Sequence, residues 1–252
     1  MRITVPNSLW YLESGDELTR SNAELDTGHA LAGPIAVREA RAGQTLAVRI
    51  DDVRPGSWGF TPAEDGGVPW ELDGGLGRAL EREIRLAPFL GVLGMPPPEP
   101  GVHSTVPPRR WGGNIDCKEL VAGTTLYLPI PVDGALFSAG DGHAAQGDGE
   151  VAGWAIETPV EATLTIDVRG DLSLEWPIAR TAGAWLTFGF DEELGRAARI
   201  AVDGMIALMG RELGVTGGDA LVLASIGVDL RITQVVNQTL GVHAVLRDDA
   251  FG

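Results

Sequence analysis

The sequence predicts a mainly β fold, of the sandwich or barrel kind, with an α+β part at its C-terminal end. The 252 residues include 35 glycines and 16 prolines, which divide the chain into short segments. Many of these segments alternate apolar and polar residues, as strands do when one face of a sheet is buried. Short strands separated by frequent turns are typical of β-sandwiches and β-barrels.

The segments with the clearest alternation are expected to be strands over residues 34–39, 45–53, 85–93, 124–129, 134–138, 151–157 and 162–169. A glycine closes the tripeptides at 41–43 and 121–123, and we expect turns there because glycine adopts backbone angles that other residues avoid.

The C-terminal third adds helices to this pattern. Asp191 is a suitable N-cap, and the two glutamates that follow it fall in a first turn, where acidic side chains complement the helix dipole. An apolar stripe at helical spacing continues to about Leu213, and Gly214 offers a stop. A second helix is expected over residues 219–226, followed by a strand over 228–236, so this part is predicted to be α+β.

A proline-rich stretch at residues 95–100 cannot continue a helix or a central strand. It predicts a crossing between an N-terminal β-rich unit, residues 1–100, and a second unit, residues 101–252. The second unit contains the central β segment and the α+β part. The two units can pack as one domain.

Composition limits the partners that the protein can have. The chain carries 35 acidic residues against 19 lysines and arginines, a net charge of −16, and such a field repels phosphate backbones, so nucleic acid is not an expected partner. No apolar run approaches the length that spans a bilayer, and no basic-then-apolar leader follows Met1, so no membrane partner is expected. Cys117 is the only cysteine, which excludes a disulfide framework and favours the cytoplasm.

Acidic residues and glycines surround one histidine in residues 112–157. The possible ligand side chains in this stretch are Asp116, Asp141, His143, Asp148, Glu150 and Glu157. Carboxylates and an imidazole can hold a divalent cation, which polarises a carbonyl group and activates water. In this interpretation Asp116, Asp141 and His143 are ligands and Glu150 moves the proton. The alternative is that the acids and glycines form hydrogen-bonded turns at a sheet edge without a metal.

Asp141 and His143 are two residues apart, so they lie on one face if the segment is extended. His29, just before a predicted strand, is a second candidate imidazole ligand, and the alternative for it is a loop histidine that bonds to the backbone.

Other chemistries fit the sequence less well. No Gly-x-Ser-x-Gly elbow is present. Cys117, Lys118 and Glu119 have the residue types of a Cys-Glu-Lys amidase triad, but adjacent residues on a strand point to opposite faces, and a lone cysteine is more often a small buried hydrophobe. The glycines around Asp141 lack the lysine of a phosphate-binding loop.

The same segment resembles the acetamidase/formamidase family. The likeness is carried by residues 112–116, 120–129, 134–150 and 155–157, with agreement in the flanking stretches 29–34, 40–46, 88–94 and 229–237. The resemblance implies a β-rich homo-oligomer that hydrolyses a short, neutral aliphatic amide, such as formamide or acetamide, to ammonia and the carboxylate. It also implies a divalent metal, zinc or calcium.

The resemblance places the family's site at Asn114, Asp116, Asp141, His143, Gln146 and Glu150, and the separate roles follow from the chemistry of these residue types. The expected catalytic residues are Glu150, Asp116 and Asp141; the expected substrate-binding residues are Asn114, Gln146 and Gly113; the expected metal ligands are Asp116, Asp141, His143 and His29. Two alternatives stay open: a non-catalytic protein that binds a metal or a small ligand on the same scaffold, and a hydrolase of a different C–N bond, such as that of a ureide or a larger amide. The short N-terminal part leaves the size of the substrate open.

Overall fold

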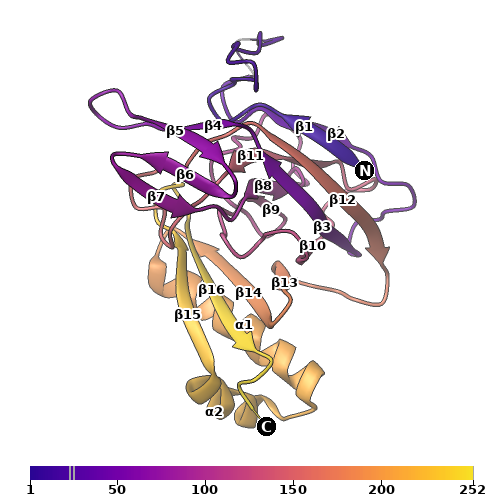
Figure 1. Ribbon diagram of the computed structural model, residues 1–252. Helices are drawn as coiled ribbons and strands as arrows, with labels where there is room; N and C mark the ends of the chain where they lie inside the picture. The colour runs from indigo at the N-terminus through magenta and orange to yellow at the C-terminus, as the bar shows by residue number, and fades with distance from the viewer. Residues whose placement is uncertain (23, 25, 252) are drawn as a thin grey trace.

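The computed structural model describes residues 1–22, 24 and 26–251. Within these residues the chain is mainly β, with three sheets and a helical layer at the C-terminal end (Figure 1). The mainly β fold with an α+β C-terminal part, predicted from the sequence, is confirmed.

The strands in chain order are β1 (Arg2–Val5), β2 (Leu31–Ile35), β3 (Thr45–Pro55), β4 (Trp58–Thr61), β5 (Val68–Asp73), β6 (Leu76–Ala79), β7 (Arg82–Arg85), β8 (Phe89–Gly94), β9 (Gly112–Asn114), β10 (Thr125–Pro129), β11 (Phe137–His143), β12 (Val160–Arg169), β13 (Ile178–Arg180), β14 (Ala184–Asp191), β15 (Val228–Gln234) and β16 (Leu240–Arg247). The helices are α1 (Leu194–Leu213) and α2 (Gly217–Gly227).

The largest sheet has eight strands in the order β1-β12-β3-β10-β13-β14-β16-β15. Its neighbouring strands are antiparallel. Strands from the first hundred residues and from the last sixty therefore share one sheet. The division into units at residues 1–100 and 101–252 stays a prediction, and the shared sheet favours its variant in which the two units pack as one domain.

A second sheet, in the order β2-β11-β8-β9, packs against the large sheet. Leu46 and Val48 of β3 belong to the same buried cluster as Leu90 and Leu93 of β8 and Phe137 of β11. Every residue of β8 is buried, as expected for a strand enclosed on both faces. The candidate site lies around this strand.

The helices cover the C-terminal end of the large sheet (Figure 1). Ala201 and Met205 of α1 belong to one buried cluster with Val242, Ala244 and Leu246 of β16. This apolar stripe is the one predicted from the helical spacing, and the predicted stop at Gly214 is confirmed by its left-handed C-cap conformation.

The start of α1 differs from the prediction. Asp191 ends β14, its carboxylate accepts a hydrogen bond from the amide of Glu193, and Glu193 is the N-cap. The helix therefore has no acidic residue in its first turn. Asp191 belongs to the sheet because β14 pairs with β16 as far as Asp191, opposite Leu240.

The expected strand over 151–157 is wrong. These residues form a turn and an irregular segment, with only a bridge at Glu157. The segment turns at Gly153 and then places the Glu157 carboxylate in the interior, so its alternation of apolar and polar residues does not reflect a strand. The four-stranded meander β4-β5-β6-β7 was not predicted, since glycines and charges interrupt its alternation.

Candidate active site

Four buried carboxylates converge on His143. Asp141 and His143 lie on β11, Asp116 follows β9, and Glu150 and Glu157 come from the segment between β11 and β12. All five side chains are almost completely buried. The predicted pairing of Asp141 with His143 on one side of an extended segment is realised, since Oδ1 of Asp141 lies 3.4 Å from Nε2 of His143.

Gly91, at the centre of β8, separates Asp116 from Asp141. Its carbonyl accepts hydrogen bonds from the amides of Ile115 and Asp116, which fixes the turn after β9. A Cβ atom at this position would lie 2.4 Å from Oδ1 of Asp116 and 2.4 Å from Oδ2 of Asp141. Glycine is therefore required so that the two carboxylates can approach across the strand.

The hydrogen bonds of Gln146 determine which nitrogen of His143 carries a proton. The Gln146 side-chain amide donates to the backbone carbonyl of Asp116 at 2.7 Å, so its oxygen faces Nδ1 of His143 at 2.9 Å. A carbonyl oxygen only accepts, so Nδ1 is protonated. Nε2 is then the nitrogen free to bind a cation, and Gln146 orients the imidazole. The expected role of Gln146 in binding substrate stays a prediction.

Glu157 completes the surroundings of Nε2. Its Oε1 lies 3.4 Å from Nε2 and accepts a hydrogen bond from the amide of Ala155, while its Oε2 accepts one from the hydroxyl of Ser8 at 2.5 Å. Phe89 packs edge-on against the His143 ring at 5.0 Å between centroids. The imidazole is thereby held between an aromatic wall and two carboxylates.

Asp116 is oriented by the loop after β15. The side-chain amide of Asn237 donates a short hydrogen bond to Oδ2 of Asp116, and this amide is itself placed by Gln234, whose side-chain oxygen accepts from the backbone amides of Val236 and Asn237. Gly149, next to Glu150, also pairs with this strand end. The C-terminal hairpin therefore positions two of the site carboxylates.

The backbone is strained at three of the acidic residues. Asp116, Asp141 and Glu150 have φ angles of 50°, 61° and 44°, in the left-handed region that favours glycine. Each such residue costs on the order of 1 kcal/mol or more, and strain of this kind collects at functional sites. The surrounding hydrogen bonds hold the three carboxylates in a conformation that the free chain would seldom adopt.

Burial and mutual repulsion perturb the proton affinities of these groups. Burial, together with the neighbouring charge of Asp116, raises the pKa of Glu150 to about 9. Burial raises the pKa of Glu157 to about 7. Burial alone would lower the pKa of His143, but the facing carboxylates of Glu157 and Asp141 raise it well above its usual range. The cluster has more negative charge than its own residues neutralise, so it attracts a proton or a cation.

The donor atoms fit a divalent cation. Three oxygens are buried and have no hydrogen-bond partner within residues 1–22, 24 and 26–251: Oδ1 of Asp116, Oδ1 of Asp141 and Oδ1 of Asn114. The ligand atoms of Asp141, His143 and Glu157 lie within 4.8 Å of one another, as do those of Asp116, His143 and Glu150. The two 3.4 Å separations at Nε2 equal the edge of a tetrahedron with bonds of about 2.1 Å, the length typical of zinc.

The remaining predicted residues lie around this centre. His29 is near Asp141, with Nε2 4.0 Å from Oδ2, and its Nδ1 contacts the hydroxyl of Thr105. Its role as a ligand stays a prediction. Asn114 is buried beside Asp116 on β9, and Gly113 lines a cavity of about 410 Å³ that also includes Thr105. Their roles in binding substrate stay predictions.

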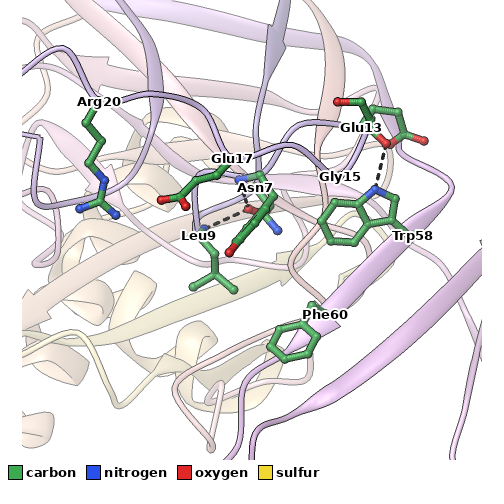
Figure 2. A pocket seen from close by; sticks show the side chains of 10 residues that line it. Asn7, Leu9, Glu13, Gly15, Glu17, Arg20, Trp58 and Phe60 are labelled. Carbon is green, nitrogen blue, oxygen red and sulfur yellow. Dashed lines mark hydrogen bonds between the residues drawn. The ribbon is translucent and has the colours of Figure 1, made fainter.

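A larger cavity, of about 800 Å³, lies over the N-terminal loop (Figure 2). Asn7 and Leu9 on one side and Trp58 and Phe60 on the other form its walls. Ser8, between Asn7 and Leu9, is the residue that hydrogen-bonds Glu157. Ser8 thus links the loop that lines the cavity to the acidic cluster.

The cysteine chemistry considered from the sequence is not assembled. Cys117 is buried, and burial together with the charge of Glu119 raises the pKa of its thiol well above the usual range, which removes the thiolate that a nucleophile needs. Lys118 pairs with Asp148 at 3.1 Å.

Sequence reasoning missed Gly91 and Asn237 and gave Glu157 no role. The nearest signal for Gly91 was its place inside the apolar run of residues 89–94. Glu157 was visible only as one acidic residue among several. Asn237 lies 121 residues from Asp116, and nothing local to either residue indicates that they meet.

The fold and the site define a β-sheet protein with a buried carboxylate–histidine centre between segments distant in the chain. Residues 100–184 match the sequence model of the Acetamidase/Formamidase family. The chain is 51% identical over 47 residues to an acetamidase of Mycolicibacterium smegmatis and, over the same length, to a formamidase of Methylophilus methylotrophus. Each alignment covers 19% of this chain and 12% of the relative.

The fold extends the likeness over the whole chain. A crystal structure of an acetamidase from Bacillus halodurans superposes with a TM-score of 0.87 at 27% identity, covering 98% of this chain and 88% of that one. The resemblance to the acetamidase/formamidase family, stated from the sequence, is thereby confirmed.

Among the described residues, no helix is both long and apolar enough to cross a membrane.

Proposed function

We propose that the protein hydrolyses a carboxylic amide, of the size of formamide or acetamide, to ammonia and the carboxylate. The observation that carries this proposal is the convergence of Asp116, Asp141, Glu150 and Glu157 on His143, whose Nε2 is left free by the hydrogen bond at Nδ1. The likeness to acetamidases and formamidases supports the choice of substrate class.

Asp141, His143 and Glu157 are the residues proposed to hold a divalent cation, zinc or calcium, and Asp116 and His29 lie near enough to take part. Such a cation, when bound, polarises the amide carbonyl and lowers the pKa of water. Glu157 is added here to the ligands expected from the sequence, because its Oε1 and Oδ1 of Asp141 lie at the same distance from Nε2.

The proton transfers are assigned to two other carboxylates. Burial raises the pKa of Asp116 to about 6, close to neutrality, which suits a group that takes a proton from the attacking water. Glu150, with its higher pKa, carries a proton that it gives to the amide nitrogen. Water oxygen then bonds to the carbonyl carbon, the C–N bond breaks, and nitrogen leaves as ammonia with the proton from Glu150. Asn114 and Gly113 are proposed to contact the amide.

The direct test is ammonia release from formamide, acetamide and propionamide by the purified protein. We expect activity that is lost on chelation and restored by a divalent ion, and that His143→Ala abolishes while the folded protein persists. Arg41→Ala, which changes a surface pair with Asp133 far from the centre, is the matched control. Stoichiometric metal without product across the whole panel would instead favour the non-catalytic binding protein.

The cavity in Figure 2 supports a second candidate, an amidase for a larger, apolar amide. Its volume of about 800 Å³ is within the range of pockets for drug-sized ligands, and Trp58 and Phe60 offer aromatic walls. If the acyl group extends past Ser8 into this space, Trp58→Ala raises KM for an aromatic amide and leaves KM for formamide unchanged. If Trp58→Ala has the wild-type KM for the aromatic amide as well as for formamide, this candidate is contradicted.

We further propose that two copies pair through β15, the edge strand of the large sheet. Leu230 and Ile232 are exposed there beside exposed Ile226 of α2. A two-fold axis through Leu230 would place Asp229 opposite Arg231 of the partner subunit, a pairing of opposite charges in an antiparallel ladder. Light scattering should show a dimer that Leu230→Lys dissociates and Leu80→Lys, at another exposed position, does not. A wild-type monomer at micromolar concentration would contradict it.

We also propose a reducing compartment, the cytoplasm, which suits the one thiol of the chain. Cell fractionation with detection of the protein in each fraction tests this, and recovery mainly from a periplasmic or secreted fraction would contradict it.

A further inference from the structure

A second cluster of ligand-type side chains lies on the other side of the loop that carries Asp116. Cys117 and Glu119 belong to that loop. His243 lies on β16, a strand of the large sheet. The Sγ atom of Cys117 lies 3.2 Å from Oε2 of Glu119, and Nε2 of His243 lies 3.4 Å from the same oxygen. The three ligand atoms lie within 4.8 Å of one another.

The observation that points to a ligand is the state of His243. Its side chain is fully buried, and its Nε2 atom has no hydrogen-bond partner in the part of the chain that the structure describes, although it faces Glu119. Its other nitrogen, Nδ1, is held by the hydroxyl of Thr233 at 2.8 Å. This is the usual arrangement of an imidazole that binds a metal, with one nitrogen fixed by a neighbour and the other left for the ion.

Glu119 has one carboxylate oxygen available to bind the same ion. Arg231 donates to Oε1 of Glu119, so Oε2 remains to face the thiol and the imidazole. Arg231 also lies 3.9 Å from Asp148, which in turn pairs with Lys118. Glu119 is the most exposed member of the three, which leaves a path from solvent to its side of the cluster.

We infer that Cys117, Glu119 and His243 form a second metal site, selective for zinc and separate from the carboxylate-rich centre at His143. Zinc accepts an imidazole, a carboxylate and a thiolate, which the Cys117 thiol becomes by giving up its proton as the ion binds. The 3.2 Å from Sγ of Cys117 and the 3.4 Å from Nε2 of His243 to Oε2 of Glu119 are close to the edges of a tetrahedron around an ion of that size.

The proposed ion would stabilise the fold. It would join the loop after β9 to β16, and this loop carries Asp116, one residue before Cys117. The inference does not depend on the proposed amide chemistry, because the two clusters share no residue.

Cobalt substitution tests this site directly, because a thiolate bound to Co²⁺ gives a near-ultraviolet charge-transfer absorption and the chain has one cysteine. Whole protein, extracted with chelator and loaded with Co²⁺, should show this band with the intensity of one thiolate-bound cobalt per chain. The band should disappear in Cys117→Ser and in His243→Gln, and persist in His143→Ala, which affects only the other centre.

Zinc analysis gives a second measurement that does not rely on cobalt. Wild-type protein dialysed against zinc should retain one equivalent more than Cys117→Ser, and its melting temperature should rise with zinc more than that of the variant. Absence of a thiolate band in cobalt-loaded wild-type protein would overturn the inference without any variant having to fold. So would equal zinc contents in the wild type and both variants.

Discussion

Gly91→Ala is the perturbation that the geometry defines most closely. The added Cβ would stand 2.4 Å from one oxygen of Asp116 and 2.4 Å from one of Asp141, whereas ordinary contacts begin at 3.4 Å. Each carboxylate, or the strand between them, must therefore move by about 1 Å, a displacement that can reduce catalysis about 100-fold. This corresponds to a loss of about 2.7 kcal/mol of transition-state stabilisation.

The assay is kcat/KM for ammonia release from acetamide, with metal content and melting temperature measured on the same samples. Gly147→Ala is the matched control, since a Cβ there would meet no atom within 4 Å although the residue lies in the same segment as Glu150. The backbone of Gly91 needs no left-handed conformation, so alanine is acceptable to the strand itself. Gly91→Ala with wild-type kcat/KM and wild-type metal content would refute the reasoning that the two carboxylates act across this strand.

Three further predictions follow from the site and the fold. Asn237→Ala should lower kcat/KM about 10–100-fold, because Asp116 loses the donor that orients it, and a loss no larger than that of exposed Asn22→Ala would contradict this role. In protein freed of metal, the pKa values of Glu157 (about 7) and Glu150 (about 9) are raised, so the native state holds protons that the unfolded state releases. The free energy of unfolding should therefore fall as pH rises from about 5 to 9. Urea titrations that show rising stability over this range would contradict this prediction. Gly214→Ala should cost about 1 kcal/mol of unfolding free energy, because the C-cap of α1 has φ 67°, and Gly183→Ala, with open space around its Cβ, should cost less.

The sequence indicated the centre of the site because much of it is local. Asp141 and His143 alternate on one strand, and that period brought them to one side of β11 as expected. The glycines beside them allow β11 to pack closely, since a Cβ on Gly142 would lie 2.5 Å from the carbonyl of Thr158.

Other parts of the site depend on contacts between distant segments. Gly91 matters only because β8 lies between β9 and β11 in the second sheet, an order that no local pattern indicates. Asn237 reaches Asp116 through the hairpin of β15 and β16.

The local pattern was also misleading where tertiary contacts decide the conformation. Residues 151–157 alternate like a strand but turn inward so that Glu157 meets His143 and Ser8. Asp191 has the residue type of an N-cap but is paired in β14. In both cases the partner that determines the conformation lies in another element of the chain.

The central claim is that Asp141, His143 and Glu157 hold a divalent cation on which amide hydrolysis depends. The most direct test is titration of a divalent ion into chelated Cys117→Ser protein, which lacks the thiolate of the second cluster, with the initial rate of ammonia release from acetamide measured at each step. The rate should rise in proportion to bound ion and level off at one equivalent per chain, and Glu157→Gln should weaken the binding. A rate that is already maximal in the chelated protein, with no ion bound, would contradict the account.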